Sequence, residues 1–390
     1  MSKTNELPMP KFTKVRYKAW ALDRMTPSNE KTENSYFLSN EQGIEISGIS
    51  TTYYQLDQEL IDQGVILMSV IDAQKKHSEL FERLRGQVVF DETDQLTYQN
   101  AHQFNTGIFL YIPSHVTVHD VLHLTLNQLA TSEADFVARI LIYVGDNASV
   151  NILQTLNTIG NKVTKASIVV EVIASESSSV QFNSIDALKE NTSAYINRQA
   201  DVRSHAQLDW HNVAFNDGQV VTNLVSQLNG ENAISHANVI AITHKKQTQG
   251  FVTKVINYGR HSVGHIFQRG VILNRSNLIF NGVGKIIKGA KGSDAQQESR
   301  VLMLSRHARG DANPLLLIDE NDVTAGHAAS VGRIDAEQLY YLMSRGLSEK
   351  TARKLVIRGF MGDVLAKMPT KASKQYVIQA IESKLIDEDK

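Results

Sequence analysis

The stretch NPLLLIDENDVTAGHAASVGRIDAEQLYYLMSRGLSEKTARKLVIRGF, Asn313–Phe360, contains three successive patterns. Leu315–Ile318 is apolar and predicts a strand that ends at an acidic pair. Thr324–Ser330 consists of small residues around one titratable side chain, His327, and predicts a loop. The remaining residues predict two short helices.

The ends of these two helices can be located from their capping residues. Asp335 is placed as an N-cap with Gln338 three residues later, which is the capping-box spacing. Gly346 follows the first helix, where a left-handed residue is usually glycine. Ser348 is placed to cap the second helix, and Gly359 is expected to end it.

This segment resembles the C-terminal part of the SufB/SufD proteins, the scaffold subunits of iron–sulfur cluster assembly. The matching pieces are Asp322-Val323 followed by His327, Val331–Asp335, Tyr340-Tyr341, Ser344–Gly346 and Arg358–Phe360. A weaker match, Asn105–Pro113, extends the resemblance back to Phe104, so that it covers roughly residues 100–365.

Composition limits the class of protein. A chain of 390 residues is expected to form two or three structural units. The net charge of −1 gives no electrostatic footprint for nucleic acid. The absence of cysteine excludes disulfides and a cluster held by this chain's own thiolates. The N-terminus MSKTNELPMPKF has no apolar signal region, and no apolar run approaches the ~20 residues that span a bilayer, so we expect a cytoplasmic protein.

Residues 1–97 are predicted to form a mainly helical N-terminal cap. Residues 1–50 are polar and predict extended segments, with Trp20 as an anchor onto a larger body. From Gln55 to Arg85 the apolar spacing becomes three and four, which indicates helix, and Gly86 ends it.

Residues 98–333 alternate short β-type runs with small polar corners. The runs include Ile108–Ile112, Ala138–Val144, Ile168–Ile173, Val239–Ile242 and Leu278–Phe280. The corners recur at Ala148, Ser178, Ala206, Ala233 and Ser262, with spacings of 30, 28, 27 and 29 residues. A nearly constant period with no helices between the runs predicts a mainly β fold, a stacked β-solenoid, with a β-sandwich as the alternative. The resemblance implies a right-handed parallel β-helix.

Residues 334–390 are predicted to be helical. After Pro369 an amphipathic segment repeats apolar residues at Val377, Ile378, Ile381 and Leu385. Between Arg333 and Lys390 there are 11 Lys and Arg against 8 Asp and Glu, a net charge of +3. This modest charge favours a partner-docking surface over nucleic-acid binding, and the resemblance implies that the region docks the ATPase SufC.

His327 is the candidate cofactor-binding and metal-binding residue. Imidazole suits iron or zinc, and small neighbours allow another chain to approach closely. The alternative is a loop histidine that only bonds a backbone carbonyl. The resemblance implies that His327 faces a cysteine of a SufB partner, where a nascent iron–sulfur cluster forms transiently, with none bound stably by this chain alone. Related SufD chains can carry cysteine two residues earlier, where this chain has Ala325.

Other histidines are weaker candidates. His115, His119 and His123 are spaced by four residues, which on a helix would form a metal-binding face. Apolar residues alternate against them, however, and predict a strand with a polar outer face. His261 and His265 show the same spacing at a predicted corner.

Two further stretches partly resemble enzyme motifs. The glycine-rich stretch 282–293 fails the spacing of a phosphate-binding loop, so no nucleotide hydrolysis is expected. Asp209, His211 and Asp217 are the nearest approach to the clustered carboxylates of a β-helix polysaccharide lyase or hydrolase.

The leading hypothesis is a non-catalytic scaffold subunit of the SufD type. By resemblance it pairs with SufB through its solenoid and C-terminal strands and docks SufC through its helices. ATP-driven SufC dimerisation would then strain the interface and expose the assembly site. The resemblance leaves a homodimer of the isolated chain open as an alternative, and neither nucleic acid nor a membrane is an expected partner. The alternatives are a β-helix carbohydrate-active enzyme and nucleic-acid binding through the C-terminal helices.

Overall fold

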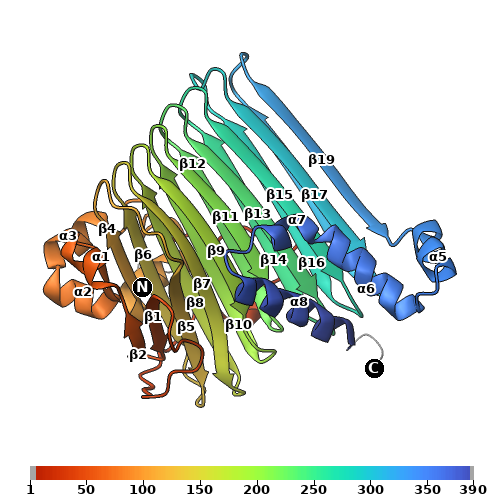
Figure 1. Cartoon of the computed structure of the whole chain (residues 1–390), viewed down its shortest axis with the longest axis horizontal. Coiled ribbons are helices and arrows are strands. Elements are labelled where there is room, and N and C mark those ends of the chain that lie inside the picture. The colour runs from red at the N-terminus through yellow and green to blue at the C-terminus, as the bar shows by residue number, and fades with distance from the viewer. Residues whose placement is uncertain (1–5, 387–390) are drawn as a thin grey trace.

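Two facing β-sheets form a parallel β-solenoid, with helices at both ends of the chain (Figure 1). The structure is a computed structural model and describes residues 6–386, apart from the side chains of residues 363, 364 and 386. The outer ends of the predicted terminal regions, residues 1–5 and 387–390, lie outside the described part. The mainly β solenoid expected from the repeat is confirmed.

Sequence neighbours alternate between the two sheets. The ten-stranded sheet has the order β19 (Thr324–Arg333), β17 (Asp294–Met303), β15 (Val263–Ile272), β13 (Ile234–Thr243), β11 (Gln207–Ala214), β9 (Ser179–Ala187), β7 (Ser149–Gly160), β5 (Leu122–Ala130), β1 (Gly43–Ser47) and β2 (Ser50–Gln55). The nine-stranded sheet has the order β18 (Arg309–Ile318), β16 (Asn277–Ile286), β14 (Thr248–Asn257), β12 (Gln219–Leu228), β10 (Thr192–Val202), β8 (Thr164–Ala174), β6 (Phe136–Val144), β4 (Thr106–Ile112) and β3 (Ile66–Ser69). Every predicted β-type run lies in one of these strands.

The repeat has a backbone cause at the corners. Asn147, Ser177, His205, Asn232 and His261 have positive φ angles between 55° and 58°. Each directly precedes one of the five corner markers, whose side chains are buried. The left-handed residue turns the chain, and the small residue after it fits inside the coil. The corners also bond to one another, as when the Asn147 N–H donates to the Glu176 carbonyl at 2.9 Å.

The N-terminal region is less helical than predicted. It contains α1 (Gln58–Asp62), α2 (Val70–Lys76), α3 (Ser78–Leu84) and α4 (Gln95–Gln103), and Gly86 follows α3 with a φ of 74° as expected. It also contains β1, β2 and β3, which extend both sheets. β1 is fully buried and pairs in parallel with β5. Packing against the solenoid therefore makes this segment a strand, although its own sequence did not indicate one. The division at residues 97 and 333 stays a prediction.

Both outer faces of the solenoid are partly covered. α6 (Glu349–Phe360), α7 (Gly362–Ala366) and α8 (Lys371–Ile386) lie across the ten-stranded sheet (Figure 1). As the amphipathic pattern predicts, Val377, Ile381 and Leu385 are buried there. α2 and α3 cover the start of the nine-stranded sheet, and residues 7–28 cover much of the rest. No described helix is long and apolar enough to cross a membrane.

Candidate functional site

His327 lies in the middle of a strand and not in a loop. β19 includes the whole Thr324–Ser330 segment and pairs with β17 in register from Asp294↔Thr324 to Met303↔Arg333. The prediction of a loop was wrong because small residues are typical of loops, whereas here they line the last coil of the solenoid. The His327 side chain is exposed, and its register partner on β17 is the buried Gln297.

β19 and β18 are the terminal strands of their sheets, and each is ten residues long. The Thr324 N–H donates to the Ser293 carbonyl, so every second residue of β19 bonds inward to β17. The residues between them, including His327 and Ala329, therefore present their N–H and C=O groups at a free edge. On β18 the same alternation places Pro314 at the free edge, where its missing N–H breaks no ladder bond.

The side chains near this edge are apolar and partly exposed. Leu315, Leu317 and Ile318 on β18 and Val331 on β19 are all more than one-third exposed. Glu320 holds the corner between the two strands by accepting hydrogen bonds from the N–H groups of Gly289 at 3.0 Å and Asn321 at 2.9 Å. These bonds, with Lys288 nearby, lower the pKa of Glu320 to about 2. In the terminal coil, the corner is therefore held by hydrogen bonds, whereas the outer edges of β18 and β19 have no neighbouring strand in the described part of the chain.

The helices after β19 have three of the four predicted ends. The Asp335 carboxylate accepts from the Glu337 N–H at 2.8 Å at the start of α5 (Ala336–Ser344), and the Ser348 hydroxyl accepts from the Thr351 N–H at 3.2 Å at the start of α6. Gly346 has a φ of 90°. Gly359, however, lies inside α6, which ends one residue later.

The surface of α5 and α6 carries large apolar side chains. Tyr340 is 74% exposed, Tyr341 is 56% exposed, and Met343 and Leu355 are also exposed. Figure 1 shows that α5 projects beyond the end of the solenoid. Several exposed large apolar side chains on a projecting helix and its neighbour are typical of a protein-docking surface.

The other candidate residues do not come together as a catalytic or metal site. His115 lies at a left-handed corner and only His123 lies in a strand, so the single strand predicted for them was wrong. Asp209 pairs with His236 at 2.7 Å, and Asp217 pairs with His244 at 2.8 Å. Within residues 6–386, no three or more His, Asp or Glu side chains are grouped so as to hold a metal ion.

His261 and His265 also have separate surroundings. His261 lies at a corner with a φ of 55°, as predicted, whereas His265 lies in β15 and pairs with Asp294 at 2.9 Å. The glycine-rich stretch 282–293 is shared between β16 and the next corner, which is not the strand–loop–helix context of a phosphate loop.

Two buried ion pairs were not anticipated from the sequence, one in the solenoid interior and one between the nine-stranded sheet and the N-terminal region. Arg198 donates to both oxygens of Asp186, at 2.6 and 3.0 Å, and to the side-chain oxygen of Gln154 at 2.7 Å. On the outer face of the nine-stranded sheet, the Arg139 guanidinium donates to the Glu171 carboxylate at 2.6 Å, and the Val89 N–H of the N-terminal region donates to the same carboxylate at 3.1 Å. The four charged side chains are fully buried. Their sequence signal was a charged residue within a strand, which without the fold does not reveal a partner.

Comparison with known proteins connects this geometry to a family. The chain matches the family model described as SUF system FeS cluster assembly, SufBD core domain, over residues 127–360. The model described as SufBD protein N-terminal region matches residues 48–124. The chain therefore belongs to the SufBD family of iron–sulfur cluster assembly proteins.

Two individual relatives have names that place them in the same family. The chain is 36% identical to the iron–sulfur cluster assembly protein SufD of Bacillus subtilis (strain 168), over 99% of this chain and 92% of that protein. It is 25% identical to an iron–sulfur cluster assembly SufBD family protein of Staphylococcus epidermidis (strain ATCC 12228), over 81% of this chain and 68% of that protein. The family resemblance inferred from the C-terminal motifs is confirmed.

Proposed function

We propose that this chain is a non-catalytic scaffold subunit of iron–sulfur cluster assembly in the cytoplasm. It pairs with a cysteine-bearing paralogue of the SufB type and docks an ATPase of the SufC type. The observation that carries the proposal is the position of His327, exposed on a ten-residue strand with a free edge. Neither nucleic acid nor a membrane is part of the proposed assembly.

The free edges of β18 and β19 are the proposed pairing surface. Their unpaired backbone groups and the exposed Leu315, Leu317 and Val331 fit a partner that adds strands to both sheets. The same edge is available to a second copy of the chain, so the isolated protein would form a homodimer through it. A SufB-type paralogue would then displace that second copy.

The nascent cluster is the cargo of this interface, and His327 would supply one ligand. Neutral imidazole nitrogen is a suitable ligand for iron, and the chain has no cysteine. The thiolates must therefore come from the partner. With Ala325 in place of the cysteine seen in some relatives, His327 is the one side chain of β19 that we assign to the cargo.

The exposed apolar surface of α5 and α6 is the proposed ATPase dock. ATP-driven dimerisation of this ATPase would move α5 and α6 relative to the free edge, strain the pairing interface and expose the assembly site. In this model the chain itself performs no chemistry, because its role is to position a ligand and transmit motion.

Reconstitution of the three-subunit complex with His327→Ala tests the ligand role. We expect the complex to form normally and cluster assembly to fall at least about tenfold, because one ligand is lost without a change in the interface backbone. His307→Ala is the matched control, since His307 is also exposed and lies at the corner before β18. Undiminished assembly with His327→Ala would remove the ligand role, and failure of the two partners to co-purify with the unchanged chain would contradict the proposed function itself.

A further inference from the structure

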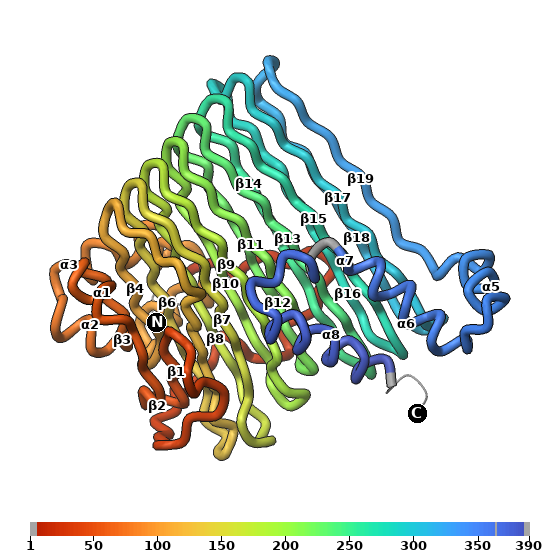
Figure 2. Tube along the Cα trace, viewed as in Figure 1, coloured from red at the N-terminus to blue at the C-terminus, as the bar shows by residue number. Residues whose placement is uncertain are grey.

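An N-terminal hairpin-shaped segment, residues 7–28, crosses the outer face of the nine-stranded sheet (Figure 2). We call it the strap. Its base is held beside β4 and β6: the Gln95 N–H donates to the Pro8 carbonyl at 3.0 Å, and the Ser28 N–H donates to the Asp135 carbonyl at 2.7 Å. Its tip, Thr13 and Lys14, reaches the other end of the sheet.

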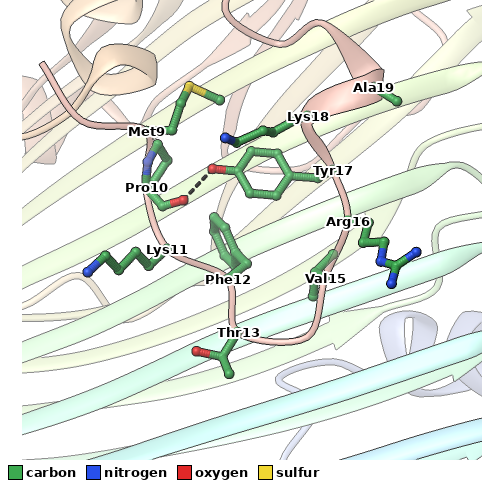
Figure 3. Close-up of a pocket in the computed structure, with 10 residues that line it drawn as sticks. All are labelled: Met9, Pro10, Lys11, Phe12, Thr13, Val15, Arg16, Tyr17, Lys18 and Ala19. Atoms are coloured by element: carbon green, nitrogen blue, oxygen red, sulfur yellow. Dashed lines mark hydrogen bonds between the residues drawn. The ribbon is translucent and has the colours of Figure 1, made fainter. Parts of the chain in front are cut away.

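The strap packs against the nine-stranded sheet through buried side chains. Phe12 and Tyr17 are buried against Tyr195, Val221 and Val252 of β10, β12 and β14. Figure 3 shows the two limbs facing each other, with the Tyr17 hydroxyl donating to the Pro10 carbonyl across the hairpin. Burial raises the pKa of Tyr17 above its ordinary value, as expected for a phenol held in an apolar contact.

The path of the strap follows the register of the sheet. Tyr195 pairs with Val221, Val221 with Gly250, Gly250 with Ile279 and Ile279 with Asp311, so these residues form one row across five strands. Gly250 leaves room for the strap. A Cβ atom there would come within 2.4 Å of the Val15 side chain.

The tip ends on the edge strand β18. The Lys14 ammonium donates to the Asp311 carboxylate at 2.8 Å and to the Asn313 side-chain oxygen at 2.7 Å, although Lys14 and Asp311 are 297 residues apart. The Asn281 side chain on β16 donates to the Thr13 carbonyl at 3.3 Å. Burial raises the pKa of Asp311, but the hydrogen bonds and charges of Lys14 and Arg309 outweigh it and leave the pKa below its ordinary value.

We propose that the strap is a clasp for the pairing edge, in which Lys14 positions β18 through Asp311 and Asn313. β18 has a neighbouring strand on one side only, so its ladder to β16 is free to fray. The strap supplies a second attachment that is anchored at the opposite end of the sheet. It keeps β18 extended and in the plane that an added strand must match.

The clasp itself is independent of the proposed function, whereas its effect on pairing rests on that function. Hydrogen–deuterium exchange of peptides covering residues 309–318 in the full chain tests the clasp. With Lys14→Ala we expect exchange there to be about two- to fivefold faster, which is the range of a partly exposed ion pair. Lys11→Ala is the control, because it removes the same charge from the same hairpin and leaves the tip contacts intact.

A charge swap separates positioning from simple loss of packing. Lys14→Glu alone should speed exchange in β18 further, and adding Asp311→Lys should restore it. Gly250→Val should displace the strap by collision with Val15 and reproduce the Lys14→Ala effect on β18. The clasp is overturned if exchange in residues 309–318 stays at the wild-type rate with both Lys14→Ala and Gly250→Val.

Pairing is measured separately, as the affinity of the chain for a SufB-type paralogue. Lys14→Ala should weaken it by the same two- to fivefold factor, and the charge swap should restore it. Faster exchange with unchanged affinity would confine the clasp to the free chain and overturn its positioning role in pairing. Absence of pairing by the unchanged chain would contradict the proposed function, while the exchange experiment would still decide the clasp.

Discussion

A few buried charged side chains inside the solenoid are expected to have a large effect on its free energy of unfolding. Arg198 and Asp186 are both fully buried, and the Asn212 amide donates to the same Asp186 carboxylate at 3.1 Å. A buried ion pair gains little over apolar packing, but removing one partner leaves an uncompensated charge. Removing one partner should therefore destabilise the protein far more than replacing both.

Asp186→Ala is expected to destabilise the protein by about 3–5 kcal/mol, because the Arg198 guanidinium would stay buried without its carboxylate. Replacing both partners, as Asp186→Leu with Arg198→Met, should recover most of that loss. Chemical denaturation measures both. Asp201→Ala is the control, since its pair with Arg203 is partly exposed and should contribute less than about 1 kcal/mol. A double variant as unstable as the single one would contradict this account.

At the scale of elements, α8 is attached to the solenoid by an ionic contact beside its apolar face. The Lys384 ammonium donates to the Asp217 carboxylate and to the Asn216 carbonyl, the latter at 3.2 Å. Burial raises the pKa of Asp217, but hydrogen bonds and charge from His244 and Lys384 outweigh it and lower the pKa to about 2. α8 therefore joins a corner of the solenoid as well as its sheet face.

Asp217→Asn is expected to loosen α8 and lower stability by about 1–2 kcal/mol, a discounted figure because the carboxylate is 41% exposed. Exchange should rise in residues 371–385 and stay unchanged in β6. Glu190→Gln, which removes a more exposed carboxylate from the neighbouring corner, is the matched control. Equal losses of stability in the two variants would show that the contact of Asp217 with Lys384 does not hold α8 to the solenoid.

The stability of the sheet face under the C-terminal helices is expected to depend on pH through His211 of β11. Burial, with the charge of Lys367, lowers the pKa of His211 from 6.5 to about 4, although Asp209 acts in the opposite direction and His236 adds to the decrease. The unfolded chain therefore binds this proton more readily. The contribution of His211 is fully present above about pH 6.5 and is lost as the pH falls towards 4, by up to about 3 kcal/mol.

His211→Gln should flatten the stability profile between pH 6.5 and 4, as measured by denaturation at each pH. His307→Gln, which removes an exposed imidazole, is the control. A profile with the same slope in His211→Gln and the unchanged chain would assign the pH dependence to other groups.

At the scale of the whole molecule, the two ends of the solenoid differ. The N-terminal end is closed by short antiparallel strands, since β2 pairs with β1 and β3 pairs with β4 in that sense. The C-terminal end stops at two ten-residue strands with free edges. Soluble proteins usually block such edges, so an open pair indicates an assembly surface.

Ala329→Pro tests that surface without breaking the fold. By the alternation along β19, the Ala329 N–H points to the free edge, so proline there removes a bond available only to a partner. We expect pairing to weaken at least about tenfold, with stability changed by less than about 1 kcal/mol, measured by analytical ultracentrifugation and denaturation. Ala328→Pro is the contrast, since its N–H bonds to β17 and its loss should destabilise the coil. Normal pairing by Ala329→Pro would exclude this edge.

Features of the chain with a local cause could be predicted without the fold. The turn at each corner, the caps at Asp335 and Ser348 and the left-handed Gly346 depend on residues within a few positions of one another, and the repeat of the corners can be counted along the chain. The apolar face of α8 was likewise predicted from its spacing. Motifs in the last coil and in the helices after it also indicated the family, because each is continuous in the chain.

Contacts between distant residues decided the rest. Thr324–Ser330 became a strand because β17 pairs with it, and β1 joined the core through β5. The strap, the burial of His211 beneath the helical cover and the free edge beside His327 each depend on which coils end up adjacent. Local spacing carries no information about such neighbours. Stacking pairs Asp294 with Thr324, 30 positions apart, and the strap joins Lys14 to Asp311, 297 positions apart.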